Sequence, residues 1–570
     1  MQEYTTVMGK RRSAVKQAVE QALLTAREKG ALNFGQIADF LVERPREAEH
    51  GDFAVNIAMI MAKACGKAPR DIAKAIAEHI DFCNTGIAKM EIAGPGFINF
   101  RMEEDWLNHA LADMLTEGTC FGESNAGRGQ KIQVEFVSAN PTGELHMGNA
   151  RGAAIGDSLA AVLQLAGYEV EREFYINDAG NQIEKFAATL DALYLQTLGQ
   201  DIPFPEDGYH GADLPLLIKE LVSQIGDKYL HIEEDLRREY LAEYALKEKI
   251  SAIRSALENF NVHYDVWFSE RSLHDSGAIK NALQHLRDMG WLLDKEGATW
   301  IDCARFSKYA GETDEEKLPK PEVLVRANGL PTYFAADIAY HLNKFQRGFN
   351  SVIDIWGADH HGHVERMKGS MEAFGYNPEQ LEIILMQFVR LYQNGEILKM
   401  SKRTGTYVTL EELVEEVGRD AARFFFVMRS ADSLIDFDMD LAKSESSDNP
   451  VYYVQYAHAR IHSILAQANG ADAGITVDPL LLSGQAEKDL ILTLADFPDE
   501  IAIAAQNREP HRLAMYLLTL AGQFHNFYTH CHCIVEDKPL MAARLALIKT
   551  TAQVIKKGLN ALGVSAPEKM

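Results

Sequence analysis

The sequence is poor in cysteine, with six among 570 residues, and only Cys531 and Cys533 lie close together. This number and spacing do not make the disulfide framework of a secreted protein. The sequence also has no apolar run of the ~18 residues that a membrane-spanning helix needs. The N-terminal residues include a basic Lys-Arg-Arg run at 10–12 and lack the apolar core of a signal peptide. We therefore expect no membrane association and a reducing cytoplasm as the location.

Two histidine-rich stretches lack the spacing of a metal site. His360, His361 and His363 follow one another too closely to present three imidazoles on one face of a regular element. Residues 530–533 are His-Cys-His-Cys, but no second pair of ligands follows them. The sequence also contains no Gly-x-x-x-x-Gly-Lys-Ser/Thr loop, which excludes a P-loop ATPase. We expect no zinc and no other metal bound by protein side chains.

Positive charge is scarce as well. The formal net charge is −25, which by itself argues against a nucleic-acid partner. The charge is uneven, however, because residues 451–570 hold 10 Lys and Arg against 11 Asp and Glu. From Lys538 onward, six basic residues stand against Glu568 alone. A basic last helix is more often a solvated face, so charge leaves the question of a polyanion partner open.

A chain of 570 residues is too long for one hydrophobic core, and its composition, 47% hydrophobic and 24% charged, is that of an ordinary globular protein. A small N-terminal α/β domain is predicted by strand signals at 91–100 and by helical periodicity at 15–28, 53–65 (with Asp52 as a candidate cap) and 70–79. A linker rich in glycine follows at 118–129. We expect four parts: residues 1–120, a central part at 121–395 with a mainly helical insertion at about 185–261, a connecting part at 396–446, and a helical bundle at 447–570.

The most informative stretch is a turn between a strand and a helix. An apolar run at 132–137 predicts a buried parallel strand, and turn-forming residues at 140–143 end it. Helical spacing begins at Gly148, so His146 and Gly148 stand at a helix N-terminus. Such a terminus binds anions through free backbone N–H groups and the helix dipole. The stretch predicts a nucleotide site in which His146 donates to a phosphate and Gly148 lets the ligand approach the backbone.

Other polar groups follow neighbouring strands. Strand signals at 170–176 and 351–356 each precede a polar run. Before the second strand, Tyr333 and Asp337 lie four residues apart, on one face of a predicted helix. An aromatic ring and a carboxylate together suit a flat, cationic ligand group. Spacing alone favours a core tyrosine and a solvated aspartate, so the pair stays a candidate.

A second motif is the basic string Lys-Met-Ser-Lys-Arg at 399–403. It is followed by Gly405 and by the predicted start of a helix near Thr409. A short basic loop of this kind can close over a triphosphate and neutralise charge on the leaving pyrophosphate. Two lysines at this spacing would be weak evidence for such a loop by themselves. The whole five-residue string, following a His-x-Gly turn, is a much more specific signal.

The two motifs resemble known signatures. His-Met-Gly-Asn at 146–149 resembles the HIGH signature of the class I aminoacyl-tRNA synthetases, and the string at 399–403 resembles their KMSKS signature. Further strings resemble the bacterial arginyl-tRNA synthetases, at 51–54, 94–100, 138–143, 265–270, 333–340, 356–362, 420–425 and 449–460. The resemblance thus extends over nearly the whole chain.

The resemblance implies an α/β fold, with a class I synthetase Rossmann-type parallel sheet, an N-terminal α/β domain and a C-terminal α-helical bundle. It implies ATP-dependent activation of L-arginine to arginyl-adenylate, then transfer to the 2′-hydroxyl of the terminal adenosine of tRNA(Arg). Mg²⁺ would accompany ATP. The N-terminal and C-terminal domains would contact tRNA(Arg), and we expect a monomer. Rings on which unpaired bases could stack, unless they belong to the core, are Tyr452, Tyr453, Tyr456, Phe524, Phe527 and Tyr528.

The resemblance also implies roles for particular residues. Those expected to act in catalysis are His146, Gly148, Asn149, Lys399 and Lys402. ATP would contact His146, Gly148, Asn149, Gly357, Asp359, His360, Met400 and Ser401. Arginine would contact Glu135, Ser138, Asn140, Tyr333, Asp337 and His360. Carboxylates suit the planar, permanently charged guanidinium, and a neutral isostere such as citrulline would leave Glu135 and Asp337 unpaired.

One position departs from the signature, because Asn149 replaces its second histidine. Asparagine can donate a hydrogen bond but cannot be cationic, which puts part of the transition-state stabilisation in question. Two other classes of protein stay open: an adenylate-forming enzyme that does not use tRNA, and a catalytically silent tRNA-binding protein. A synthetase for lysine is the alternative within the class. We expect an active enzyme.

Overall fold

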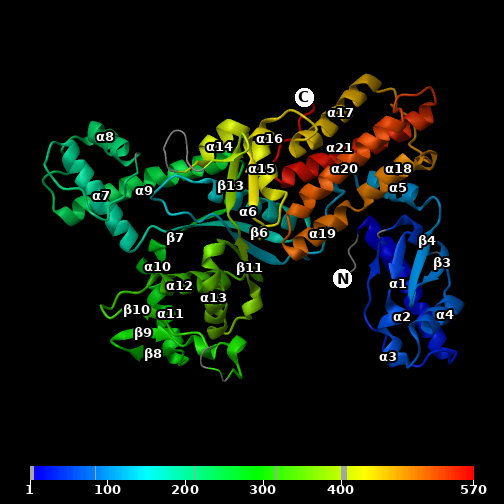
Figure 1. Ribbon diagram of the computed structural model, residues 1–570, viewed down its shortest axis with the longest axis horizontal. Helices are drawn as coiled ribbons and strands as arrows, with labels where there is room; N and C mark the ends of the chain where they lie inside the picture. Colours follow the sequence, from blue (N-terminus) through cyan, green and yellow to red (C-terminus); the bar gives the residue numbers. More distant parts are fainter. Residues whose placement is uncertain are drawn as a thin grey trace.

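The computed structural model describes residues 6–45, 47–83, 85–211, 213–312, 314, 317–398 and 407–570. The basic string at 399–403 lies outside the described residues, and with it Lys399, Met400, Ser401 and Lys402. The molecule is elongated, with the N-terminal part beside the C-terminal helices at one end and residues 181–259 at the other (Figure 1). None of the helices in the described part of the chain combines the length and apolar character that crossing a bilayer requires.

The N-terminal part combines α-helices with a four-stranded antiparallel sheet. Its strands, in spatial order, are β1 (Val42–Glu43), β2 (Phe53–Val55), β4 (Phe97–Met102) and β3 (Ile87–Ala93). Its helices are α1 (Val7–Glu28), α2 (Ile57–Ile60), α3 (Ala62–Cys65), α4 (Pro69–His79) and α5 (Trp106–Glu117).

The helix predicted over 53–65 is wrong in its first residues, which form β2. Phe53 and Val55 are buried where β2 pairs with β4. Asp52 does not cap a helix; its carboxylate accepts a hydrogen bond from the Met102 backbone N–H at 2.8 Å. A short apolar run fits the period of a strand or of a helix, so pairing with β4 decided the outcome.

The centre of the molecule is a five-stranded sheet in which all neighbouring strands are parallel. Its spatial order is β12 (Leu381–Met386), β11 (Ser351–Gly357), β5 (Lys131–Glu135), β6 (Glu169–Ile176) and β7 (Val266–Ser269). The chain adds strands outward in both directions from the β5–β11 pair, which makes this pair the topological switch point. The Rossmann-type α/β fold is confirmed, and ligands of such sheets bind at the carboxyl ends of the strands at the switch point.

Helix α6 (Met147–Leu165) follows β5 and packs very close to it. A Cβ atom at Gly156 would come within 2.2 Å of the Phe136 ring, so glycine permits the approach. Nearer the N-terminus of the same helix, the buried Arg151 donates to the carbonyl oxygens of Gln387 at 2.6 Å and Ser430 at 2.8 Å. Arg151 thereby ties α6 to the connecting part of the chain.

The connecting part holds a three-stranded sheet of β14 (Glu396–Ile397), β13 (Val389–Gln393) and β15 (Ile435–Asp438), with helices α14 (Leu410–Val417), α15 (Arg419–Val427) and α16 (Met439–Lys443). Three helices cover the expected insertion: α7 (Asn181–Thr197), α8 (Leu214–Ile225) and α9 (Glu234–Asn259). A second small sheet, outside the parallel one, consists of β10 (Glu322–Val325), β9 (Ala298–Ile301) and β8 (Leu292–Lys295). Beside it lie α10 (Arg271–Asp275), α11 (Ala278–Asp288), α12 (Tyr333–Gln346) and α13 (His361–Ala373).

The C-terminal part is a helical bundle, as predicted (Figure 1). Its helices are α17 (Pro450–Ala468), α18 (Gln485–Ala495), α19 (Phe497–Asn507), α20 (His511–His530) and α21 (Lys538–Ala561). All six cysteines are free, and Cys531 and Cys533 are buried at the end of α20.

A buried arginine joins the bundle to the central part. Arg423 on α15 donates to the carbonyl oxygens of Leu562 at 2.7 Å, Phe260 at 3.1 Å and Asn261 at 2.9 Å. Its remaining nitrogen pairs with the Asp157 carboxylate on α6 at 2.6 Å. One guanidinium therefore satisfies groups from three segments far apart in sequence, which only its planar fork of donors can do.

We predict that Arg423→Leu destabilises the protein by about 3 kcal/mol, because three buried carbonyls lose their donor and a buried ion pair is broken. The matched control is Arg390→Leu, which breaks the half-exposed pair with Asp436 and should cost less than about 1 kcal/mol. Chemical denaturation followed by tryptophan fluorescence measures both. Equal destabilisation by the two variants would contradict the role given to Arg423.

Candidate functional site

The turn that carries His146 is held against the segment that follows the basic string. The Met147 N–H donates to the Val408 carbonyl at 3.3 Å, and the Leu410 N–H donates to the Leu145 carbonyl at 2.8 Å. Between these bonds, His146 and Thr409 form an isolated antiparallel bridge. The two segments that flank the sequence signatures are therefore neighbours in space.

The His146 side chain caps its own helix. Its Nδ1 accepts from the backbone N–H groups of Gly148 at 3.0 Å and Asn149 at 3.3 Å. An Nδ1 that accepts carries no hydrogen, so the neutral ring carries it on Nε2. Burial lowers the pKa of His146, which favours this neutral form. The site thus presents a neutral Nε2–H donor.

This geometry corrects the prediction that the backbone N–H groups at this terminus are free for an anion. Two of them are bonded to the ring of His146. The Asn149 Oδ1 completes a capping box by accepting from the His146 backbone N–H at 3.0 Å. Gly148 has a structural role as well, since a Cβ there would lie 2.9 Å from the Cε1 of His146.

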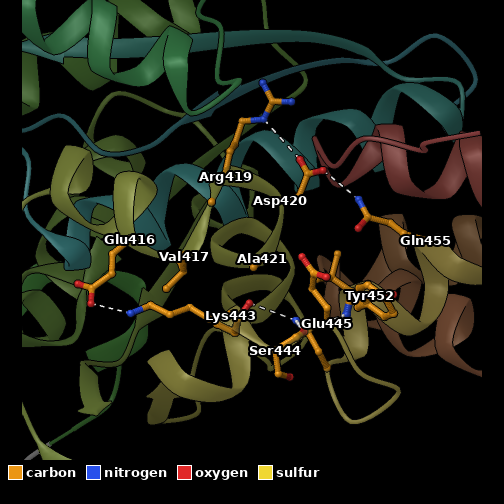
Figure 2. Close-up of a pocket in the computed structure, with 14 residues that line it drawn as sticks. Glu416, Val417, Arg419, Asp420, Ala421, Lys443, Ser444, Glu445, Tyr452 and Gln455 are labelled. Atoms are coloured by element: carbon orange, nitrogen blue, oxygen red, sulfur yellow. Dashed lines mark hydrogen bonds and ion pairs between the residues drawn. The ribbon is translucent and has the colours of Figure 1, made fainter. Parts of the chain in front are cut away.

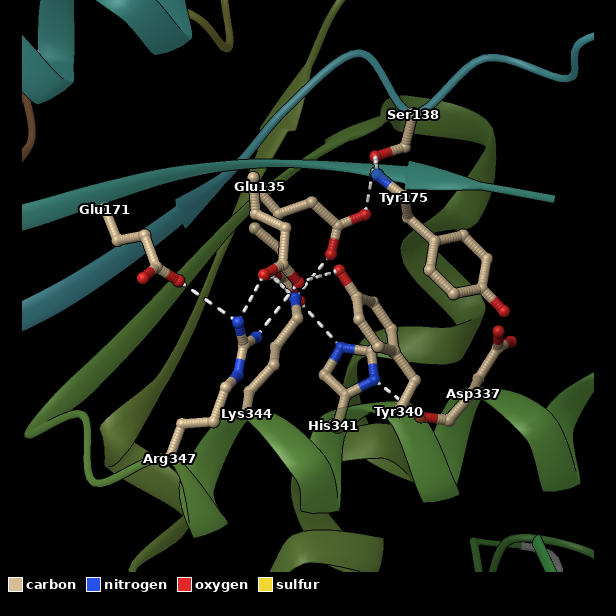
Figure 3. Close-up of polar contacts among 11 residues, drawn as sticks. Glu135, Ser138, Glu171, Tyr175, Asp337, Tyr340, His341, Lys344 and Arg347 are labelled. Atoms are coloured by element: carbon tan, nitrogen blue, oxygen red, sulfur yellow. Dashed lines mark hydrogen bonds and ion pairs between the residues drawn. The ribbon is translucent and has the colours of Figure 1, made fainter. Parts of the chain in front are cut away.

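An acidic cluster of Asp337, Glu270 and Glu135 lies beyond the carboxyl ends of β5 and β6. Burial raises the pKa of Asp337 to about 7, and the carboxylates of Glu270 and Glu135 add to the shift while His341 opposes it. The Asp337 side chain makes no hydrogen bond or ion pair with the described residues. The buried hydroxyl of Tyr175 makes no well-aligned hydrogen bond with the described residues, although the Glu270 and Asp337 carboxylates act on it electrostatically. Figure 3 shows the Tyr175 hydroxyl and the Asp337 carboxylate pointing toward one another.

Each carboxylate oxygen of Glu135, at the end of β5, has one partner within the protein. Its Oε2 contacts the ammonium of Lys344, and its Oε1 accepts from the Ser138 hydroxyl at 2.7 Å. That hydroxyl in turn accepts from the Tyr175 backbone N–H at 3.1 Å. Val137 and Ser138 have φ angles of +71° and +40°, a left-handed turn that a β-branched residue such as valine adopts at a cost. The strained turn places the Ser138 hydroxyl against Glu135.

The remaining predicted residues lie around the same edge of the sheet. Tyr333 and Asp337 stand on the first turns of α12, and Tyr333 is exposed. Asn140 is exposed in the turn after β5. Asp359 and His360 follow β11, next to β5, and form an exposed pair at 3.6 Å. Gly357 is the last residue of β11.

The sequence analysis did not single out three residues in or beside the acidic cluster: Tyr175, Glu270 and Lys344. Glu270 is buried directly after β7, and Tyr175 near the end of β6. Lys344 had a detectable signal, because it lies seven residues after Asp337 and hence on the same helix face. A lysine on a face that also carries a candidate site residue is a reason to suspect a buried ion pair.

A separate cavity of about 640 Å³ lies between the connecting part and the bundle (Figure 2). Its polar lining includes Asp420, which accepts from the Gln455 amide at 2.9 Å, and Lys443, which pairs with Glu416 at 2.6 Å. None of the described residues that line it was predicted as an ATP or arginine contact. It borders Tyr452 on α17, so it belongs to the bundle side of the molecule.

The aromatic residues of the bundle that were candidates for stacking on tRNA bases differ in exposure to solvent. Phe524 and Phe527 are buried in the core, so they cannot stack on bases, and the core interpretation is right for both. Tyr456 is 40% exposed, and its ring stacks on that of Tyr452 with centroids 6.3 Å apart. Tyr528 is held by Arg460, which donates to its hydroxyl at 2.6 Å.

Three family profiles match the chain. The profile described as the catalytic domain of class I (R) tRNA synthetases matches residues 110–442. The arginyl tRNA synthetase N terminal domain matches residues 11–102, and the DALR anticodon binding domain matches residues 454–570.

Individual proteins are similar over their whole length. The arginine–tRNA ligase of Desulfitobacterium hafniense is 57% identical over 555 residues, which are 96% of this chain and 97% of the relative. That of Moorella thermoacetica is 54% identical over 567 residues, 98% and 99% of the two chains. The solved structure of Thermus thermophilus arginyl-tRNA synthetase superimposes with a TM-score of 0.75 at 25% identity and covers 98% of this chain and 100% of its own.

The raised pKa of Asp337 predicts a stability effect with a definite sign. Between the ordinary aspartate pKa of about 4 and about 7, the folded protein holds a proton that the unfolded chain releases, so this group makes stability fall as pH rises. Asp337→Asn should therefore raise the melting temperature of the ligand-free protein at pH 8. The gain should shrink toward zero near pH 4. Thermal melts of both proteins across this range test it, and a gain that is independent of pH would contradict it.

Proposed function

The chain belongs to the arginyl-tRNA synthetases of class I, and from this premise we propose which of its residues carry the reaction. The enzyme activates L-arginine with ATP to arginyl-adenylate and pyrophosphate, and transfers the arginyl group to the 2′-hydroxyl of the terminal adenosine of tRNA(Arg). In the first step, the arginine carboxylate attacks the α-phosphate. No enzyme nucleophile is required, so catalysis rests on positioning and on stabilising charge.

Asp337 is the carboxylate that receives the guanidinium. The observation that carries this assignment is that Asp337 lies in the acidic cluster with no side-chain hydrogen bond or ion pair among the described residues, while burial raises its pKa to about 7. A guanidinium supplies several donors and a permanent positive charge, which would satisfy Asp337 and the neighbouring Tyr175 hydroxyl together. Glu135, at the end of β5, and Ser138, in the turn after it, belong to the same site, and the exposed Tyr333 on α12 completes it. Such a site rejects citrulline, because a neutral group leaves the carboxylate uncompensated.

ATP occupies the edge of the sheet between the His146 turn and the residues that follow β11. The neutral Nε2–H of His146 is a donor for a phosphate oxygen, while Gly148 and Asn149 hold the ring in place. Gly357, Asp359 and His360 form the other side. Mg²⁺ enters with ATP and is held mainly by phosphate oxygens.

Residues of the basic string act on the leaving pyrophosphate. The segment at 408–410, which follows this string, pairs with the turn at 145–147. This tether supports roles for Lys399 and Lys402 in neutralising charge and for Met400 and Ser401 in nucleotide contact. Asn140, in the turn after β5, is assigned to the α-amino or carboxyl end of arginine.

The terminal domains bind tRNA(Arg). Tyr452 and Tyr456 offer stacked, accessible rings on α17, which suit unpaired anticodon bases. The N-terminal domain is assigned to the body of the tRNA. We assign the enzyme to the cytoplasm, because the six free cysteines suit a reducing compartment. We also propose that it acts as a monomer.

The function is tested by charging total tRNA with each of the twenty amino acids and with citrulline. We expect arginine alone to be attached. Asp337→Asn should lower kcat/KM for arginine by 30- to 1,000-fold, which corresponds to about 2–4 kcal/mol for the lost partner of a buried cation. The KM for ATP should stay within about threefold. The surface variant Asp436→Asn is the control, and an arginine KM unchanged by Asp337→Asn would remove Asp337 from the site.

The capping box predicts how Asn149 contributes. Asn149→Ala removes the acceptor for the His146 N–H and should lower kcat about 3- to 10-fold, since losing such a cap is worth about 1 kcal/mol. Asn149→His keeps an acceptor nitrogen and should be near wild type. If the natural protein charges no arginine while Asn149→His does, the expectation of an active enzyme is wrong.

A further inference from the structure

We propose that Lys344, a buried lysine paired with Glu135, is a positioning residue that holds the Glu135 carboxylate in place for arginine and thereby sets the affinity for this substrate. The inference rests on the arginine site proposed above. It adds a residue that contacts no reacting atom and acts through Glu135.

The geometry ties three elements to one ammonium group. Lys344 on α12 is 0% exposed, and its Nζ contacts Glu135 Oε2 at the end of β5 and Asp354 Oδ1 on β11 at 2.7 Å. The same nitrogen lies 4.5 Å from the centroid of the Tyr340 ring. Figure 3 shows the Lys344 and His341 side chains rising from α12 toward the strands.

Asp354 also contacts His341, and this histidine connects it to Asp337. The Nε2 of His341 lies 2.7 Å from Asp354 Oδ2, and its Nδ1 lies 2.7 Å from the backbone carbonyl of Asp337. A carbonyl only accepts, and an ionised carboxylate does the same, so the ring donates through both nitrogens. Glu135, Lys344, Asp354 and His341, which we call the Lys344 network, thus link Glu135 to the helix turn that carries Asp337.

The network is a balanced set of buried charges. Burial lowers the pKa of Lys344, but Asp354 and Glu135 outweigh it and raise the pKa above its ordinary value, so the ammonium stays charged. Burial likewise acts against ionised Asp354, and Lys344 with His341 overcomes it and lowers the pKa of Asp354. Removing the lysine would leave two buried carboxylates facing each other with one cation fewer.

The two carboxylates, Glu135 and Asp337, therefore have different roles toward arginine. Both oxygens of Glu135 already have a partner, Lys344 on one and Ser138 on the other, so its remaining acceptor sites point in fixed directions. Asp337 has no such partner among the described residues and supplies the uncompensated charge. A substrate guanidinium therefore meets one orienting carboxylate and one attracting carboxylate. A pre-oriented partner costs less ordering on binding.

The test compares Lys344→Met, Glu135→Gln and the double variant in the full-length enzyme. We expect Lys344→Met to raise the KM for arginine at least tenfold and to leave the KM for ATP within twofold. The double variant should have the same arginine KM as Glu135→Gln alone, because the lysine acts only through Glu135. The matched control is Lys308→Met, whose half-exposed lysine pairs with Glu365 and should leave both constants unchanged.

The outcomes separate this inference from the proposed site. An arginine KM that is unchanged or lower in Lys344→Met overturns the inference, and so does a double variant at least tenfold worse than Glu135→Gln. If Lys344→Met does not fold, the double variant, which removes both charges, still gives the second comparison. If Glu135→Gln itself leaves the arginine KM unchanged, the proposed arginine site fails at Glu135 and the inference falls with it.

Discussion

The ammonium of Lys344 is the contact on which the active-site end of the sheet depends. It lies between Glu135, the last residue of β5, and Asp354, in the middle of β11, which are paired across the two adjacent strands. Burying two negative charges on adjacent strands is costly unless a cation accompanies them. Because the lysine comes from α12, that helix is fixed over the switch point of the sheet. The position of Asp337, on the same helix, follows from this anchor.

Two buried arginines also hold distant segments of the chain together, by donating hydrogen bonds to carbonyl oxygens. Arg151 joins the helix after the His146 turn to the connecting part, and Arg423 joins α15 to the end of the bundle. Loop and helix-end carbonyls are left without partners by secondary structure, and a guanidinium can satisfy several of them at once. The central part and the C-terminal bundle are therefore connected through hydrogen-bonded contacts as well as through apolar packing.

The parts that could be predicted were those with a local signal. The strand at β5, the turn after it and α6 follow from an apolar run, turn-forming residues and helical spacing, all of which act within a few residues. The strand β2 was missed because its apolar residues fit the period of a strand as well as that of a helix. Pairing with β4 in the folded protein selects the strand. The cap formed by His146 was missed because it depends on the rotamer of one ring, which sequence spacing does not give.

The sequence by itself determined the class of the protein, since the two signatures and the strings around them are those of the arginyl-tRNA synthetases. It also determined which residues could bear charge. Only the tertiary structure decided which of these charges are available to a substrate. Glu135 and Asp337 look alike in sequence, yet Glu135 has a buried lysine beside it and Asp337 has no side-chain partner among the described residues. The physical reason is that a carboxylate's role depends on its counter-ion and burial, and both come from segments distant in the chain.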